Sequence, residues 1–441
     1  MRSSGKLVVP LLLILLIKCI ICYNPGGRRE LQSALISNKL YFYGGWDYSS
    51  GGLGDIFYID LSQPFDSSNP TFQLQSMQAP KAAYSSVVYK DEIIIFAGSG
   101  DKIGMVNDLV IINETNFFVN TTTTKNSSNS NINGWPAPRR WHPAVIDSIK
   151  AKMYIWGGED SSGSLSDAAL YNFDLLTYSW NVNTLPNQPV GRRQHTATLI
   201  PDGKIIFIGG MNTPDIAQLD IYDTIANQWS QKIAIKSGNV SARYGHTATL
   251  TPNNQSIIVY GGLSYNLNQS IGGIAVLDLT TYIWTNYTPS GDQPASPNLH
   301  TAAIYKNYII FAFGAYGIGS NNNYSSAVNI LDISNNKYKW VNLVLLDTPS
   351  KQNPEATSPN NTKTGTSPNS MNTGTPPNSL NTGIVVGLII VSVFSVGFLA
   401  IIGYLIYSRN KDKHDFESLE SKESGNEVID ESNNEVIDNG K

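Results

Sequence analysis

The chain has 441 residues, and its 30 basic and 34 acidic residues leave a formal net charge of -4 at pH 7. This balance, without any long basic run, argues against a nucleic-acid surface, which needs clustered Lys and Arg to displace counterions from phosphates. The two cysteines, Cys19 and Cys22, lie close to the N-terminus. Residues 23–441 can therefore form neither a disulfide framework nor a cysteine metal site.

The first 22 residues have the pattern of a secretory signal peptide. Arg2 and Lys6 precede an apolar run from Leu7 to Ile17, and a polar stretch follows Cys22. A signal anchor that stays in the membrane is the alternative, but the run is shorter than the roughly 20 residues that a spanning helix needs. We therefore expect residues 1–22 to be a signal peptide.

One strand-like phrase recurs six times and ends in glycine. It is clearest at Lys204–Gly210, where an apolar run of strand length is followed by paired glycines. The last glycines of successive copies are 53, 60, 52, 52 and 52 residues apart. Such a fixed period is the signature of a repeat architecture.

Each repeat is predicted to form four short strands. In the fourth copy these are Thr196–Ile200, Lys204–Ile208, Gln218–Tyr222 and a strand that begins at Trp229. Evenly spaced strands with a periodic glycine and aromatic signature are typical of a β-propeller blade. We predict an all-β propeller over residues 23–346, with six four-stranded blades favoured over seven.

The phrase, followed by an aromatic residue with Asp and by a later Trp, resembles the kelch repeat. The pattern is complete in Asp223 with Trp229, whereas Phe72 and Phe117 stand where the first two copies should have Trp. Copies two and six have each lost one glycine. The resemblance implies a kelch-type propeller of the galactose oxidase-like superfamily, with the first strand of each blade lining a central channel.

A second phrase, with Arg and His, stands at the start of the first strand of several repeats. Its histidines are His142, His195, His246 and His300, and its arginines are Arg139, Arg192 and Arg243. Equivalent positions of a propeller lie one blade apart, so these histidines would not converge on one metal ion. We interpret them as structural hydrogen-bonding groups. The arginines have two interpretations: a seat for a carboxylate at the channel mouth, or braces that bind backbone carbonyls.

The predicted loops differ between the two faces of the propeller. Turns between the first and second strands are tight, whereas loops between the second and third strands are long. Since strands alternate in direction, the long loops share a face with the starts of the first strands. Rigid scaffolds carry binding on variable loops. We expect a partner to bind this face, with candidate contacts Arg139, Arg192, Arg243, Trp46, Tyr265 and Tyr316. The alternative for the three aromatic residues is that they pack their own loops.

The composition changes after residue 346. Residues 347–383 are rich in Pro, Thr, Ser and Asn, which predicts a disordered stalk. Residues 384–407 carry no charge and are long enough for a transmembrane helix. Arg409, Lys411 and Lys413 follow directly, so the positive-inside bias predicts an extracellular propeller and a cytoplasmic tail. The acidic tail, residues 408–441, is predicted to be disordered. Its repeated Asn-Glu-Val-Ile-Asp segment has two interpretations, a docking motif for a cytoplasmic partner or a duplicated neutral sequence.

Glycosylation sequons agree with this orientation. All of them lie on the predicted outer side. They are Asn113, Asn120, Asn126, Asn239, Asn254, Asn268, Asn286, Asn323 and Asn360.

These observations predict a single-pass cell-surface protein whose propeller is a non-catalytic protein-recognition module. The galactose oxidase cofactor joins a Tyr to a Cys, and residues 23–441 lack cysteine. We therefore expect no such enzyme, no metal and no cofactor. The alternatives are a glycan-binding or wall-sensing module, or an oxidase-like enzyme that lacks the crosslink, because fold does not fix function. The expected extracellular partner is a protein or a glycan.

Overall fold

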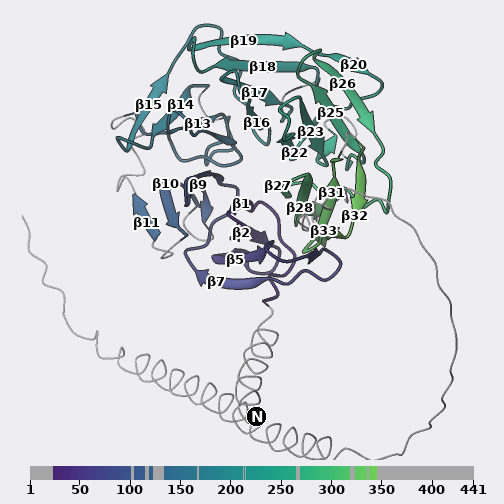
Figure 1. Ribbon diagram of the computed structural model, residues 1–441. Coiled ribbons are helices and arrows are strands. Elements are labelled where there is room, and N and C mark those ends of the chain that lie inside the picture. The colour runs from purple at the N-terminus through teal and green to yellow at the C-terminus, as the bar shows by residue number, and fades with distance from the viewer. Residues whose placement is uncertain are drawn as a thin grey trace, which may run out of the picture. The chain divides into compact units, whose positions relative to one another are not determined.

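Six sheets follow one another around a central axis in the computed structural model (Figure 1). The structure describes residues 23–100, 104–114, 119–122, 134–165, 168–211, 213, 215–264, 269–317, 323–334 and 337–344. These residues belong to one compact unit, Met1–Gln352, and a second unit, Asn353–Lys441, lies outside them. The predicted signal peptide, stalk, membrane helix and tail also lie outside the described residues. Within the described part, no helix is long and apolar enough to cross a membrane.

Each sheet is a blade whose four antiparallel strands follow one another from the axis outward. Blade 1 contains β1 (Gln32–Ile36), β2 (Lys39–Tyr43), β5 (Asp55–Asp60) and β7 (Gln73–Met77). Blade 2 contains β8 (Ser85–Tyr89), β9 (Glu92–Gly100), β10 (Gly104–Asn113) and β11 (Val119–Thr122). Blade 3 contains β12 (Ala144–Asp147), β13 (Lys152–Trp156), β14 (Leu170–Asp174) and β15 (Ser179–Asn183).

The remaining blades repeat this order. Blade 4 contains β16 (Thr196–Leu199), β17 (Lys204–Ile208), β18 (Gln218–Asp223) and β19 (Gln228–Ile233). Blade 5 contains β22 (Thr247–Leu250), β23 (Ser256–Tyr260), β25 (Ile274–Asp278) and β26 (Ile283–Tyr287), and β20 (Ile235–Ser237) extends it in parallel with β26. Blade 6 contains β27 (Thr301–Tyr305), β28 (Tyr308–Ala312), β31 (Val328–Asp332) and β32 (Lys339–Val341).

Short two-stranded ribbons complete the described structure. They are β3 (Trp46–Asp47) with β4 (Gly51–Gly52), β21 (Arg243–Tyr244) with β24 (Leu263–Ser264), β29 (Ala315–Tyr316) with β30 (Asn323–Tyr324), and β6 (Phe65–Asp66) with β33 (Leu343–Val344). The innermost strands β1, β8, β12, β16, β22 and β27 contact one another in a closed circle. The prediction of an all-β propeller with six blades is therefore confirmed.

Apolar residues fill the six interfaces between neighbouring blades. Each hydrophobic cluster joins two adjacent blades, including the last and the first. Both faces of an inner strand are thus buried, which explains why Lys204–Ile208 is a continuous apolar run rather than an alternating one. Phe72 packs against Phe42, Phe57 and Phe313 at the interface between blades 1 and 6.

Four successive residues lead into the first strand of each blade, and we name their positions in order. The arginine position holds Arg28, Lys81, Arg139, Arg192, Arg243 and Pro297. The mouth position holds Arg29, Ala82, Arg140, Arg193, Tyr244 and Asn298. The ring position holds Glu30, Ala83, Trp141, Gln194, Gly245 and Leu299. The histidine position holds Leu31, Tyr84, His142, His195, His246 and His300.

Two closed circuits of backbone hydrogen bonds join the blades. Every ring position has a φ between 53° and 65°. Its N–H donates to the carbonyl of the ring position of the preceding blade, at 2.8–3.0 Å. The last glycine of each repeat donates to the carbonyl of the arginine position of the following blade at 2.8–2.9 Å. The seam between blades 6 and 1 takes part in both circuits, through Glu30 to Leu299 and Gly314 to Arg28.

The close approach of each glycine pair to the start of the first strand explains why glycine is needed there. Gly210 has a φ of 101°, and a Cβ there would stand 2.6 Å from the Cβ of His195. The first glycine of the pair tolerates replacement, since Ala97 and Phe313 occupy it with φ of 58° and 64°. The Phe313 ring then packs among the phenylalanines of blade 1. The lost glycines of copies two and six are thus accommodated by the ring.

We predict that Gly210→Val destabilises the propeller more than Gly238→Val. Both glycines have a positive φ, but no atom lies within 4 Å of the site of a Cβ at Gly238. Backbone strain costs about 1–3 kcal/mol at either site, and overpacking adds about 1–3 kcal/mol only at Gly210. Thermal denaturation of the two variants measures the difference, and equal melting temperatures would show that the close seating of Gly210 is unimportant.

Candidate functional site

The arginine position is buried and braces the glycine pairs. Arg139, Arg192 and Arg243 are 0%, 3% and 2% exposed. Each donates from Nη1 to the carbonyl of the first glycine of its own repeat, at 3.1, 3.3 and 3.3 Å. Arg28 and Lys81 make the equivalent bonds to Gly44 and Ala97. These contacts favour the bracing interpretation, since a ligand would have to displace a carbonyl to reach these groups.

Carboxylates neutralise some of these buried cations. Arg192 pairs with Asp220, and Arg28 pairs with Asp55 at 2.7 Å. The guanidinium group of Arg139 lies over the ring of Tyr171, with Cζ 5.0 Å from its centroid. Burial lowers the pKa of Arg243 to about 10. The arginine position is thus an internal element of each blade.

The mouth position carries the arginines that solvent can reach. The side chains of Arg29, Arg140 and Arg193 are 25%, 33% and 25% exposed. Arg140 donates twice to Oε1 of Glu159, at 2.8 and 2.6 Å, and Arg193 pairs with the other oxygen of the same carboxylate. Glu159 is itself 1% exposed. A single buried carboxylate therefore holds two guanidinium groups side by side at the junction of blades 3 and 4.

Trp141 lies beside both of these arginines. The Cζ atoms of Arg140 and Arg193 are 4.0 and 5.7 Å from the centroid of its ring, within the range of cation–π attraction. Burial lowers the pKa of both arginines, and at Arg193 the charge of Arg140 adds to this effect. We call Arg140, Trp141, Glu159 and Arg193 the mouth cluster.

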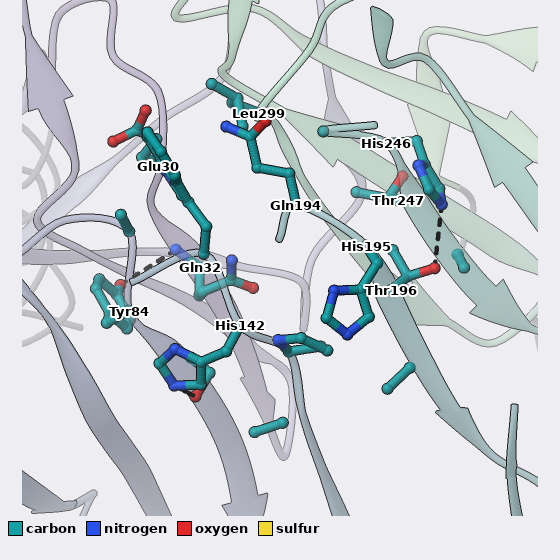
Figure 2. A pocket seen from close by; sticks show the side chains of 18 of the residues that line it. Glu30, Gln32, Tyr84, His142, Gln194, His195, Thr196, His246, Thr247 and Leu299 are labelled. Carbon is teal, nitrogen blue, oxygen red and sulfur yellow. Dashed lines mark hydrogen bonds between the residues drawn. The ribbon is translucent and has the colours of Figure 1, made fainter. Parts of the chain in front are cut away.

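A cavity of about 210 Å³ follows the axis below the mouth (Figure 2). Its lining comes from all six blades, and Glu30, Gln194 and Leu299 lie together at one end of it (Figure 2). Glu30 brings a carboxylate to this lining. Burial raises its pKa, and the charges of Arg29 and Arg140 and the indole of Trp141 oppose that rise.

The histidine position connects neighbouring blades. His142, His246 and His300 bond through Nε2 to Ser85, Thr196 and Thr247 of the preceding blade, at 2.8, 3.1 and 2.9 Å. Figure 2 shows the bond from His246 to Thr196. His195 would meet Pro143 at the equivalent place, and its ring instead packs edge-on against Trp156 at 5.1 Å. Among the described residues, no group of His, Cys, Asp or Glu could hold a metal ion.

The other residues singled out from the sequence are dispersed. Trp46 lies in β3, where its backbone pairs with Arg29, and the Tyr316 hydroxyl is 3.2 Å from Oγ of Ser325 in the loop after β30. Tyr265 lies outside the described residues. The structure does not bring Trp46 and Tyr316 into contact with the mouth cluster.

The described sequons lie mostly on the surface. Asn239, Asn254, Asn286 and Asn323 are exposed, and Asn113 is half-buried. The side chain of Asn120 is not described, and Asn126, Asn268 and Asn360 lie outside the described residues. Their use as glycosylation sites stays a prediction.

Sequence reasoning missed Arg28, Lys81 and the entire mouth position. A usable signal was the interval from the cation to the first position of the glycine pair, which is 16 residues for Arg28 and Lys81, 17 for Arg192 and 18 for Arg139 and Arg243. It also could not tell which member of Arg139-Arg140 is buried. Arg140 forms a backbone bridge with Glu159, and in such extended backbone successive side chains point to opposite sides.

We predict that Arg192→Ala destabilises the propeller by about 3–5 kcal/mol, because it leaves Asp220 buried without its cation. Arg193→Ala is the matched control, since Arg140 still pairs with Glu159 when Arg193 is removed. Urea denaturation of both variants gives the two losses. Equal losses would contradict the assignment of Arg192 to the interior and Arg193 to the mouth.

We also predict that stability falls as the pH is lowered from 7 to 5. Burial lowers the pKa of His142, His195, His246 and His300, in the last case to about 3. The unfolded chain then binds protons below about pH 6.5 that the folded chain does not bind, which costs about 1.4 kcal/mol per histidine and pH unit.

The free energy of unfolding at pH 7, 6 and 5 tests this prediction. His195→Phe should reduce the pH dependence by about one proton, since His195 lies among aromatic rings. Stability that does not change between pH 7 and 5 would contradict the neutral, buried state of these histidines.

Comparison with known proteins agrees with this architecture. Residues 112–240 and 221–363 match the KLHDC2/KLHL20/DRC7 Kelch-repeats domain, which together is more than half of the chain. The mouse Kelch domain-containing protein 1 is 27% identical over 262 residues, which are 53% of this chain and 61% of that protein. The Arabidopsis thaliana acyl-CoA-binding domain-containing protein 4 is 23% identical over 327 residues, 70% of this chain and 45% of that protein.

A solved structure shows the same fold. The structure of YjhT superposes with a TM-score of 0.54 at 14% identity and covers 72% of this chain and 99% of the other. The chain spans about three fifths of the length of the mouse relative. The repeats, the two hydrogen-bond circuits and the sequence match together show that the chain belongs to the kelch-repeat family.

Proposed function

We propose that this chain is a single-pass cell-surface protein whose propeller recognises a partner protein outside the cell and catalyses no reaction. Family membership supports an interaction module, because kelch propellers are typically non-enzymatic and bind proteins. The charge-free segment 384–407, with basic residues directly after it, supports the anchoring.

The mouth cluster is the observation that carries the proposal. Arg and Trp are enriched among the residues that dominate binding energy at protein interfaces. Here Trp141 lies beside two guanidinium groups that Glu159 already orients, so a partner need not bear the entropic cost of ordering them. The cluster has partly exposed cations, so an acidic segment of a partner fits it.

The distribution of sequons also favours binding of a partner at the mouth cluster. The mouth cluster belongs to blades 3 and 4, and no sequon lies between Asn126 and Asn239. Glycans at the other sequons would crowd other parts of the propeller. A protein partner therefore has its clearest approach over blades 3 and 4.

We predict that Trp141→Ala weakens partner binding by about 2 kcal/mol, roughly thirtyfold, while leaving the melting temperature nearly unchanged. The full chain is displayed on intact cells, and peptides selected on the wild-type protein are titrated against the variant. Lys90→Ala serves as the control, because Lys90 is exposed in the turn between β8 and β9, on the opposite face.

Two outcomes would contradict the proposal. Peptides that bind Trp141→Ala and the wild type equally would remove the mouth cluster from recognition. When protease is added to intact cells, a propeller that stays uncleaved would overturn the extracellular location.

A further inference from the structure

The face opposite the mouth carries exposed apolar side chains on blades 3 and 4. Ile149, Leu176, Tyr178 and Ile225 are 98%, 70%, 58% and 73% exposed. They lie in the turns between β12 and β13, between β14 and β15 and between β18 and β19. We call these four residues the turn patch.

Hydrogen bonds join the turns that carry the patch. The N–H of Leu175 donates to the carbonyl of Ala151 at 2.9 Å, which joins the two turns of blade 3. Nζ of Lys150 donates to Oγ1 of Thr224 at 2.9 Å, which joins blade 3 to blade 4. The four apolar side chains therefore project from neighbouring turns.

The fold does not require apolar residues at these places. Leu176 and Ile225 each follow an Asp by two residues, and their N–H groups donate to its Oδ1 at 2.9 and 2.8 Å. The same turn recurs in blades 1, 5 and 6 with polar residues. Those residues are Ser62, Thr280 and Ser334, whose N–H groups make the same bond at 2.9, 2.9 and 2.8 Å. Exposed apolar groups that the turn does not need point to a contact.

The charges around the patch are of both signs. Lys150 lies 3.4 Å from Asp147, and Lys152 lies 4.0 Å from Asp174. Lys204 pairs with Asp202 in the turn between β16 and β17. A patch of one sign would repel its own copy, whereas mixed charges around an apolar centre can pair across a two-fold axis.

No sequon lies in blades 3 and 4 on this face. Asn113, at the end of β10 in blade 2, and Asn254, in the turn between β22 and β23 of blade 5, lie on the same face, but in other blades. This step rests on the extracellular location proposed above. Copies anchored in one membrane would also meet at a high effective concentration.

We propose that the turn patch is a homodimer interface, in which two copies of this chain pack the patches of blades 3 and 4 against each other around a two-fold axis. The two copies present the same residues, so each aliphatic side chain finds an apolar surface and each cation finds a carboxylate. The mouth cluster of each copy stays free for a partner, because it lies on the other face.

Single cysteines test this contact, since residues 23–441 contain none. Ile149→Cys, Leu176→Cys and Ile225→Cys are introduced one at a time into the full chain, with Cys19→Ser and Cys22→Ser throughout. Cells are treated with a mild oxidant and analysed on a non-reducing gel. Thr280→Cys is the matched control, because it places an exposed thiol in the same turn of blade 5.

We expect a covalent dimer from at least one patch position and none from the control, because a disulfide needs Cα atoms within about 7 Å. Two double variants each add one substitution that copies a polar turn: Leu176→Ser is added to Ile149→Cys, and Ile225→Thr is added to Leu176→Cys. Each added substitution should lower the crosslinked fraction about tenfold, which corresponds to about 1.4 kcal/mol. No dimer at any patch position, or equal dimer at Thr280→Cys, would overturn the proposal.

A glycan added inside the patch tests the interface and the extracellular location separately. Thr177→Asn creates a sequon with Ser179 inside the patch, and Ser179→Ala in the same chain removes it again. A slower-migrating glycosylated band that no longer crosslinks supports the interface, and a glycosylated band that crosslinks as before overturns it. If the band does not shift, the extracellular location fails, and the cysteine crosslinks decide on the interface alone.

Discussion

Two circuits of backbone hydrogen bonds hold the six blades in a closed ring. One passes through the ring positions toward the preceding blade, and the other passes from the glycines toward the following blade. The seam between blades 6 and 1 has the same two bonds as every other junction, together with the pairing of β33 with β6. Closure therefore depends on local backbone geometry, repeated six times, more than on any one strand exchanged between the chain ends.

The same geometry determines which side chains are available for binding. The mouth position forms a backbone bridge with the residue after the glycine pair, as in Arg140 with Glu159 and Arg193 with Met211. Successive side chains of extended backbone point to opposite sides, so the arginine position faces inward, where it braces the glycine carbonyl, and the mouth position stays at the surface. Arg139 and Arg140 are neighbours in sequence, yet the first is 0% exposed and the second can reach a partner. Backbone bridges next to the ring-closing circuits thus present the mouth cluster.

The fold was predictable because its period and strand patterns are local. The predicted strand Lys204–Ile208 coincides with β17, and six glycine-terminated copies correspond to six blades. The functional surface was less predictable, since backbone hydrogen bonds do not require particular residue types and so leave no pattern in the sequence. The sequence could not distinguish a brace such as Arg192 from a surface group such as Arg193, because the register of the bridge between Arg193 and Met211 decides which of two adjacent side chains faces inward.

Hydrogen exchange of the circuit amides tests the ring most directly. The account predicts that the amides of Glu30 and Gly314 at the seam are protected as strongly as those of Gln194 and Gly210 inside the ring, because all four belong to the same two circuits. All would then exchange only through global unfolding. Faster exchange at Glu30 and Gly314 than at Gln194 and Gly210 would show that the seam opens locally and would contradict a ring closed equally at every blade.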